Sequence, residues 1–215
     1  MVAGGVDAII VENLGDAPFA ASQVAPFTVA AMTRIVSEMV GLGIPIGVNV
    51  LRNDARAALS IASATGAHFI RVNVHTGVMA TDQGILTGKA RETLLERNRL
   101  GADVAIAADV EVKHATPLGE SRLEDAAHDT WHRGQANVLI VTGSGTGRPT
   151  DGTDVQRVRS AVPEATLWVG SGIRPGHALP AGANGAIVGT WLHRDSCLEA
   201  PVSASRITEI RELLR

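Results

Sequence analysis

Two short glycine-rich segments near the end of the chain have the composition of turns that bind a phosphate group. Gly170, Ser171 and Gly172 follow one apolar run, and Gly189 and Thr190 follow another. Glycine lets backbone N–H groups approach an anion closely, and the N-terminus of a following helix adds partial positive charge. We therefore predict that both turns connect a strand to a helix and hold the phosphate of a small-molecule ligand, as two adjacent loops of a (β/α)8 barrel do.

A third glycine-rich turn begins at Gly143, where residues 143–147 read Gly-Ser-Gly-Thr-Gly. This glycine density suits close approach of the backbone to a ligand, so we add Gly143 to the predicted phosphate-binding residues. The segment does not end in Lys followed by Ser or Thr, which argues against a triphosphate-binding P-loop. A flexible turn without a ligand is the alternative interpretation.

Polar side chains near the ends of the other apolar runs form the candidate catalytic group. In a barrel these ends face the active site, and an arginine inside a strand is costly unless it is paired or faces a ligand. Two of the carboxylates, Glu12 and Asp109, are the first candidates for a general acid or base, and His114 is the next. The predicted catalytic residues are Glu12, Asn49, Arg71, Asn73, Asp109 and Lys113.

Most of these residues have a second interpretation. Lys113 is either a charge partner for a phosphate or carboxylate, or a Schiff-base nucleophile. The first is favoured because Asp109 and Glu111, expected on the same strand face, keep the amine protonated. Arg71, Asp109 and Glu111 are equally interpretable as an ion-pair network that fills a barrel interior. The strand-end asparagines could instead bond to backbone groups: Asn13, Asn49 and Asn73.

The sequence indicates no particular cofactor. The candidate metal ligands at the strand ends and in the adjoining segments are Glu12, His75, Asp82, Asp109 and His114. These side chains lack the close spacing of a metal site, so we predict no bound metal. Residues 75–88 form a long polar segment, which we interpret as a loop and a candidate lid. His128 and His132 have helical spacing on a face expected in solvent.

Seven short apolar runs alternate with helical patterns over the whole chain. They are residues 7–13, 45–51, 69–74, 104–113, 138–143, 167–172 and 185–190. Such alternation predicts a parallel sheet covered by helices, and its repeat of roughly 30 residues is that of a (β/α)8 barrel. We therefore predict an α/β fold, a single TIM-barrel domain over residues 1–215 that lacks the first β/α unit. The alternative, a doubly wound sheet, lacks its glycine fingerprint.

A barrel without one unit leaves the first and last strands, residues 7–13 and 185–190, with an unpaired edge. We expect such a chain to be poorly soluble or to pair these edges with another subunit, which makes a homo-oligomer plausible. Helix starts are indicated at Asp54, at Ser203 and at Ser121, where Glu124 completes a capping box.

Composition excludes several classes of partner. The chain has 215 residues, a formal net charge of −3 and 3% aromatic residues, so nothing indicates the basic or stacking surface that binds nucleic acid. No apolar run is long enough to insert into a membrane. The single cysteine, Cys197, is compatible with a reducing compartment, and we predict a cytoplasmic protein.

Several segments together resemble the BtpA/SgcQ family: residues 6–19, 47–54, 69–74, 81–84, 108–115, 139–143 and 170–173. The resemblance implies a ribulose-phosphate-binding type of barrel. The family is named after a photosystem I biogenesis protein, and another member is associated with sugar-metabolism genes. Family members begin with a further strand and a Pro-rich turn, which are not found at the start of this sequence.

Three functions follow as hypotheses. The first is a cytoplasmic enzyme that acts on a phosphorylated sugar or nucleotide-like metabolite as an isomerase, a lyase or a glycosidase. The second, implied by the resemblance, is a non-enzymatic factor for the biogenesis or assembly of a complex such as photosystem I. The third is a protein that binds a phosphorylated ligand without catalysis.

Overall fold

The computed structural model describes residues 1–112, 114–119, 121–143 and 150–214. Within these ranges, seven parallel strands pair in chain order to form one sheet. Each strand pairs with its neighbour in a parallel register, for example Glu12 with Asn49 and Asn49 with Arg71. The strands are β1 (Ile9–Glu12), β2 (Ile46–Asn49), β3 (Phe69–Val72), β6 (Ala105–Asp109), β8 (Val138–Val141), β9 (Leu167–Val169) and β10 (Gly185–Ala186).

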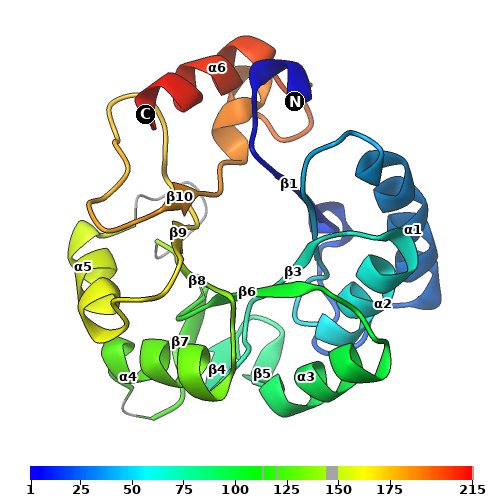
Figure 1. Cartoon of the computed structure of the whole chain (residues 1–215), viewed down its shortest axis with the longest axis vertical. Helices are drawn as coiled ribbons and strands as arrows, with labels where there is room; N and C mark the ends of the chain where they lie inside the picture. Colours follow the sequence, from blue (N-terminus) through cyan, green and yellow to red (C-terminus); the bar gives the residue numbers. More distant parts are fainter. Residues whose placement is uncertain (113, 120, 144–149, 215) are drawn as a thin grey trace.

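This sheet curls into a ring with the helices on its outside (Figure 1). The helices are α1 (Pro26–Val40), α2 (Ala55–Thr65), α3 (Ala90–Arg99), α4 (Leu123–His128), α5 (Gly152–Ala161) and α6 (Ala204–Leu213). The predicted barrel of β/α units is confirmed in an open form. In the described part of the chain, β1 and β10 are the two ends of the sheet and do not pair with each other.

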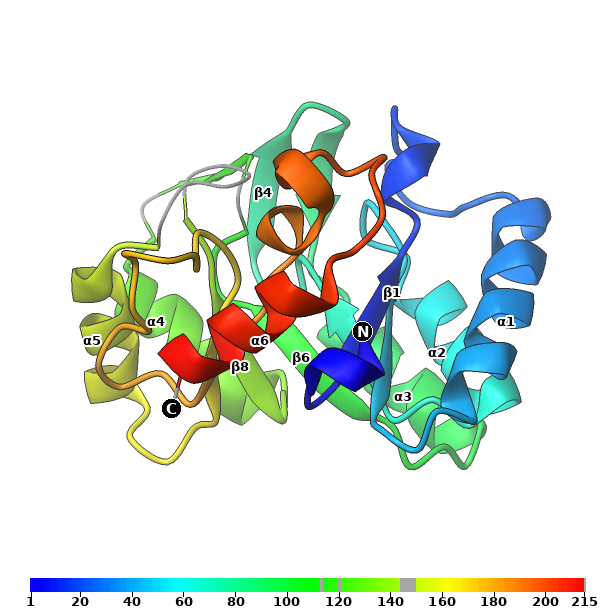
Figure 2. The same ribbon diagram turned by 90° about the horizontal axis from the view of Figure 1, so that it is seen from above.

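The N-terminal 3-10 helix η1 (Val2–Gly4) and α6 lie side by side over the gap between these two edges (Figures 1 and 2). A Cβ atom at Gly4 would lie 2.7 Å from the Cβ atom of Ile207 on α6, so only glycine permits this approach. The contact joins the two ends of the chain without supplying a strand. Pairing of the edges with a second subunit stays a prediction.

Side chains alternate between the two faces of each strand. The outward faces are apolar and pack under the helices in the main core, as Val48, Ile70, Ile106 and Leu139 do. The inward faces form a second apolar cluster around the buried residues Phe69, Ala107 and Ile140. Because both faces of the sheet are buried, the strands read as nearly continuous apolar runs.

Two aromatic rings fill the middle of the barrel. Phe69 on β3 meets Trp168 on β9 edge to face, with ring centroids 5.7 Å apart and an interplanar angle of 79°. Gly47 on β2 makes room for this arrangement, since a Cβ atom there would lie 2.3 Å from the Phe69 ring. Arg71 is the next inward-facing residue of β3, so the aromatic pair lies directly beneath it.

The prediction of a loop over residues 75–88 was wrong. These residues contain an antiparallel hairpin of β4 (Val78–Thr81) and β5 (Gly84–Thr87), to which β7 (Ala115–Pro117) adds on the other side of β4. Met79 and Leu86, paired across the hairpin, form a small separate core. Figure 2 shows the hairpin at the end of the barrel toward which the strands point.

The helix predicted after Gly172 is also absent, because the described residues between β9 and β10 contain only turns and one isolated bridge. Pro175 and Pro180 interrupt this stretch, and proline removes a helical hydrogen bond. After Gly189, the chain forms only the short 3-10 helix η4 (Thr190–Leu192). The two glycine turns therefore do not precede α-helices.

Helix starts were predicted with mixed success. Asp54 caps α2 as expected, because its Oδ1 accepts from the backbone N–H of Ala57 at 2.9 Å. Ser203 occupies the N-cap position of α6, but its hydroxyl contacts Ser205 and makes no capping bond. The capping box at Ser121 was wrong, since the N-cap of α4 is the following residue, Arg122.

Candidate active site

Arg71 is the centre of a buried polar network at the carboxyl ends of the strands. Its Nε and Nη2 atoms donate to the two carboxylate oxygens of Asp109 at 3.2 and 3.1 Å, and its Nη1 donates to Glu12 at 3.1 Å. The side chains of Arg71 and Asp109 are 5% and 0% exposed, whereas that of Glu12 is 26% exposed. Of the two carboxylates, Glu12 is therefore the one that solvent or a ligand can reach.

Two asparagines extend this network toward β2. Asn73 donates to Asp109 Oδ2 at 2.8 Å, and its own Oδ1 accepts from Asn49 at 3.2 Å. Asn49 also donates to the backbone carbonyl of Arg71 at 3.0 Å, and its Oδ1 atom is buried without a partner among the described residues. A buried acceptor in this state is a suitable place for a donor group of a ligand or for an ordered water.

Five of the six predicted catalytic residues are brought together in this way, although their catalytic role stays a prediction. The sixth, Lys113, lies outside the described residues. Asn13 and Asn49 also bond to backbone groups at strand ends, which was the alternative interpretation for them: Asn13 Oδ1 accepts from the backbone N–H of Leu51 at 2.7 Å.

The prediction that Glu111 shares a strand face with Asp109 was wrong. β6 ends at Asp109, so the alternation of faces does not continue to Glu111. Its carboxylate is instead hydrogen-bonded to Ser121 and lies near Arg157 and Asp154 of α5, and burial together with the Asp154 charge raises its pKa. The ion pairs of the described barrel interior therefore join Arg71 to Asp109 and Glu12, and Glu111 does not take part in them.

Electrostatics distinguish the two arginines at this end of the barrel. Burial acts to lower the pKa of Arg71, but the charges and hydrogen bonds of Asp109 and Glu12 raise it above its usual value. For Arg52, which follows β2 and is 6% exposed, burial prevails and lowers the pKa. The sequence places Arg52 after a strand end, but it gives no signal that this arginine is buried while other arginines are exposed to solvent.

The predicted phosphate-binding residues lie at the ends of β8, β9 and β10, with two of their amides already engaged. The N–H of Gly143 donates to Ser171 Oγ at 3.0 Å, and that of Gly170 donates to the Val141 carbonyl at 2.8 Å. Gly170 also has a steric role, since a Cβ atom there would lie 2.5 Å from Thr142 Cγ2.

Three other amides are better placed to bind an anion. The backbone N–H groups of Gly172, Gly189 and Thr190 have no hydrogen-bond partner within the described ranges. They follow the paired strands β9 and β10, whose ends are neighbours in the sheet. Phosphate binding by these residues stays a prediction, carried chiefly by these three amides.

His75 lies outside the network and is fully buried. Its Nε2 atom donates to the Gly134 carbonyl at 2.8 Å, and its Nδ1 atom has no partner among the described residues. Burial lowers its pKa, so the folded protein holds this imidazole neutral.

The unfolded chain therefore protonates before the folded one as the pH falls. The stability that depends on neutral His75 is complete above about pH 6.5 and is lost as the pH falls below that value. Replacing His75 with glutamine, which can still donate to Gly134, should reduce the pH dependence of the free energy of unfolding between about pH 5 and 7. Urea denaturation at several pH values would measure this slope. His132→Gln, at a side chain that is 44% exposed, is the control, and an unchanged slope in His75→Gln would contradict the expectation.

No group of three or more His, Cys, Asp or Glu side chains in the described residues is arranged to hold a metal ion. His128 and His132 are exposed on the outer helices, with ring centroids 4.4 Å apart, in agreement with the solvated face expected for them. No helix of the described part of the chain is long and apolar enough to cross a membrane.

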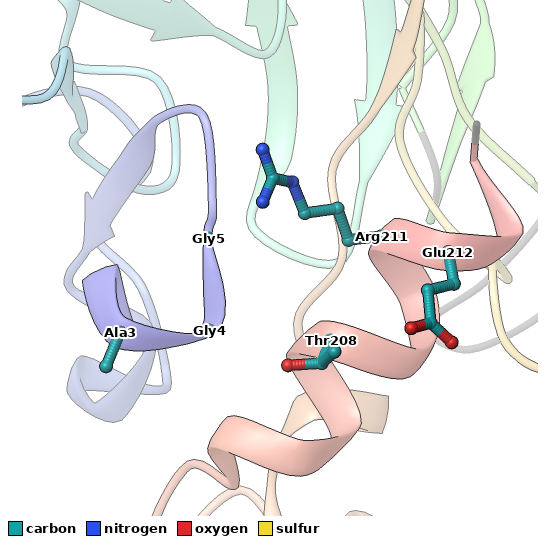
Figure 3. Close-up of a pocket in the computed structure, with 6 residues that line it drawn as sticks. All are labelled: Ala3, Gly4, Gly5, Thr208, Arg211 and Glu212. Atoms are coloured by element: carbon teal, nitrogen blue, oxygen red, sulfur yellow. The ribbon is translucent and has the colours of Figure 1, made fainter.

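Two surface cavities lie near the ends of β1. A cavity of about 240 Å³ lies between η1 and α6 and is lined by Gly5, Thr208 and Arg211 (Figure 3). Because Gly5 precedes β1, this cavity is at the amino ends of the strands, away from the polar network. The second, of about 310 Å³, is lined by Asn13, Ala20 and Thr28 and adjoins the carboxyl end of β1.

A sequence profile of the BtpA family matches residues 1–215. The chain belongs to the BtpA family. The photosystem I biogenesis protein BtpA of Synechocystis sp. (strain ATCC 27184 / PCC 6803 / Kazusa) is 46% identical over 217 residues, which cover 100% of this chain and 76% of that protein. The sgc region protein SgcQ of Escherichia coli (strain K12) is 31% identical, covering 97% of this chain and 78% of its own length.

Solved structures confirm the fold of this BtpA-family chain. KGPDC from Streptococcus mutans superposes with a TM-score of 0.61 at 13% sequence identity, covering 96% of this chain and 84% of that protein. Orotidine 5'-monophosphate decarboxylase from Metallosphaera sedula gives a TM-score of 0.57 at 14% identity, covering 96% and 97%. These neighbours show the α/β barrel fold that the sequence predicts.

Proposed function

We propose that this chain is an enzyme that acts on a phosphorylated sugar or a nucleotide-like metabolite. The observation that carries the proposal is the buried Arg71–Asp109–Asn73 network with Glu12 at its accessible edge. Burying charged groups is costly, and in a barrel the carboxyl ends of the strands are where active sites form. We also propose that the protein is located in the cytoplasm.

The residues have different parts in this proposal. Glu12 is the general acid or base, because its carboxylate is partly exposed and is oriented by Arg71. Asp109 accepts hydrogen bonds from Arg71 and Asn73, so it fixes the arginine and is a positioning residue. Asn49 offers to a hydroxyl or amine of the substrate its Oδ1, which is buried and makes no hydrogen bond within the described part of the chain. Proton transfer by a carboxylate in this position suits an isomerisation, a lyase step or a glycosidic cleavage.

The phosphate of the substrate is proposed to bind the backbone amides of Gly172, Gly189 and Thr190. Two observations support this: the amides have no partner among the described residues, and they lie at the ends of adjacent strands. The structural neighbour KGPDC has been solved in complex with D-ribose 5-phosphate, which makes a sugar phosphate the first compound to test.

A thermal-shift experiment with D-ribose 5-phosphate, nucleoside monophosphates and the unphosphorylated sugar tests this function. A phosphorylated compound at 100 times its dissociation constant should stabilise the protein by about 2.7 kcal/mol, whereas D-ribose should not. Incubation of the stabilising compound followed by ³¹P NMR should then show conversion by the natural chain and none by Glu12→Gln. If no phosphorylated compound raises the melting temperature, the proposal is overturned.

The name of the Synechocystis relative favours a second candidate, a non-enzymatic factor for biogenesis of a membrane complex. Such a factor would co-purify with membranes and would work equally well with Asp109→Asn or Glu12→Gln. An enzyme would lose its function in the Glu12 variant. A ligand-binding protein without catalysis would give the thermal shift but no conversion by ³¹P NMR.

A further inference from the structure

A half-buried arginine of α6, Arg206, holds the segment that follows β10. Its Nη1 atom donates to the backbone carbonyl of Trp191 at 2.9 Å and to that of His193 at 2.7 Å. The guanidinium group also lies over the indole of Trp191, with its Cζ atom 4.4 Å from the ring centroid. Arg206 therefore fixes the end of η4 both by its backbone and by its aromatic side chain.

The residues that Arg206 holds come directly after two amides of the proposed phosphate site. The N–H groups of Gly189 and Thr190 make no hydrogen bond within the described ranges, and the N–H of Leu192 donates to the Gly189 carbonyl at 2.8 Å. Gly189 is thus part of the same hydrogen-bonded turn. It is exposed, and a Cβ atom there would meet no described residue within 4 Å apart from its chain neighbours. A ligand can therefore approach this stretch of backbone.

Both partners of this contact are anchored elsewhere in the molecule. Ile207, which follows Arg206 on α6, is 3% exposed and lies against Gly4 of η1. Trp191 packs against the main core. Figure 1 shows α6 beside the N-terminal turn and beside the segment after β10, and it contacts both η1 and η4. Arg206 therefore joins η4 to a helix that is itself held in place.

We propose that Arg206 is a positioning residue for phosphate binding, because it fixes the turn that presents the amides of Gly189 and Thr190. This inference rests on the proposed function and adds to it a residue on an outer helix. Ordering a loop when a ligand binds costs free energy, and a loop that is already fixed avoids this cost. A guanidinium group suits the role because its planar donors bind carbonyls while its face stacks on an aromatic ring.

The first measurement compares Arg206→Met with Arg211→Met, a change on the same helix. Arg211 is exposed, lines the cavity beside Gly5 and makes no hydrogen bond within the described part of the chain. Calorimetric titration is done well below the melting temperature of each protein, with D-ribose 5-phosphate and with inorganic phosphate. Both dissociation constants should rise roughly tenfold in Arg206→Met, because the turn must then be ordered on binding. They should be unchanged in Arg211→Met.

A second measurement separates positioning of the turn from a general loss of structure. In the ¹⁵N-labelled natural chain, saturating D-ribose 5-phosphate should shift the amide signals of Gly172, Gly189 and Thr190. In Arg206→Met at saturation, the signal of Gly172 should still shift, because this residue follows β9 and is not held by Arg206. The shifts of Gly189 and Thr190 should be strongly reduced. Equal reduction of all three shifts would overturn the inference.

Arg206→Met should fold, because the N–H of Ser203 still donates to the Leu192 carbonyl at 2.8 Å and Leu192 stays buried. If it does not fold, Arg206→Lys replaces it and should weaken binding in the same direction, since a compact ammonium group lacks the rigid planar fork. If the natural chain binds D-ribose 5-phosphate and the Arg206 variant binds it equally well, this inference alone fails. If the natural chain binds neither probe, the proposed phosphate site fails with it.

Discussion

Arg71→Ala is expected to lower the free energy of unfolding by about 3–5 kcal/mol. The variant would leave the carboxylate of Asp109 buried without the positive charge of the guanidinium group and the two hydrogen bonds that it donates. A single-domain protein has only about 5–15 kcal/mol of stability, so the loss should be obvious in urea denaturation followed by circular dichroism.

Arg99→Ala is the matched control for this prediction. Arg99 also makes two hydrogen bonds to one carboxylate, that of Glu96, but its side chain is 64% exposed. Removing it should therefore cost no more than about 1 kcal/mol. The double variant Arg71→Met with Asp109→Leu removes both buried charges and should recover much of the loss. Equal losses in Arg71→Ala and Arg99→Ala would mean that the network is not isolated from water.

Phe69→Ala is expected to cost about 3–5 kcal/mol, because the ring fills the barrel interior and no neighbouring side chain can replace its volume. Phe69 is 7% exposed and contacts Trp168 edge to face. Phe27, 81% exposed on α1, is the control, and Phe27→Ala should stay within about 0.5 kcal/mol of the natural chain.

Gly47 offers a reciprocal test of the same packing. A methyl group there would overlap the Phe69 ring, so Gly47→Ala should cost about 1–3 kcal/mol. In the double variant with Phe69→Leu, the smaller side chain should relieve part of this cost. Additive losses in the double variant would contradict the direct contact between the two positions.

The barrel can be predicted from the sequence because side chains alternate along each strand between the face under the helices and the face toward the interior. On β3, Ile70 and Val72 face the helices, while Phe69 and Arg71 face the interior, and this alternation can be read without a structure. The meeting of Arg71 with Asp109 follows from the same reasoning, since each is near the carboxyl end of an inward face. Alternation fails for Glu111, because the strand ends before it.

The hairpin and the turn after β9 could not be predicted from local patterns. β4 and β5 are four residues each, too short for a clear period, and β4 is completed by β7 from a distant part of the chain. The glycines after β9 suggested a helix N-terminus, but Pro175 and Pro180 prevent one. The surroundings of Arg52 depend on hydrogen bonds from Asn13 and Asn53 in separate loops, which no spacing in the sequence reveals.

The chain-order pairing of the seven described strands has a consequence for how the protein reaches its structure. Each strand of the ring after β1 pairs with the one that precedes it in this order, so we expect β1, β2 and β3 to be able to associate on the ribosome while later units are still being translated. The packing of η1 against α6, which links residues about two hundred positions apart, has to form last. Pulsed hydrogen exchange during refolding would show the amides of β2 protected well before those of α6, and simultaneous protection would refute this order.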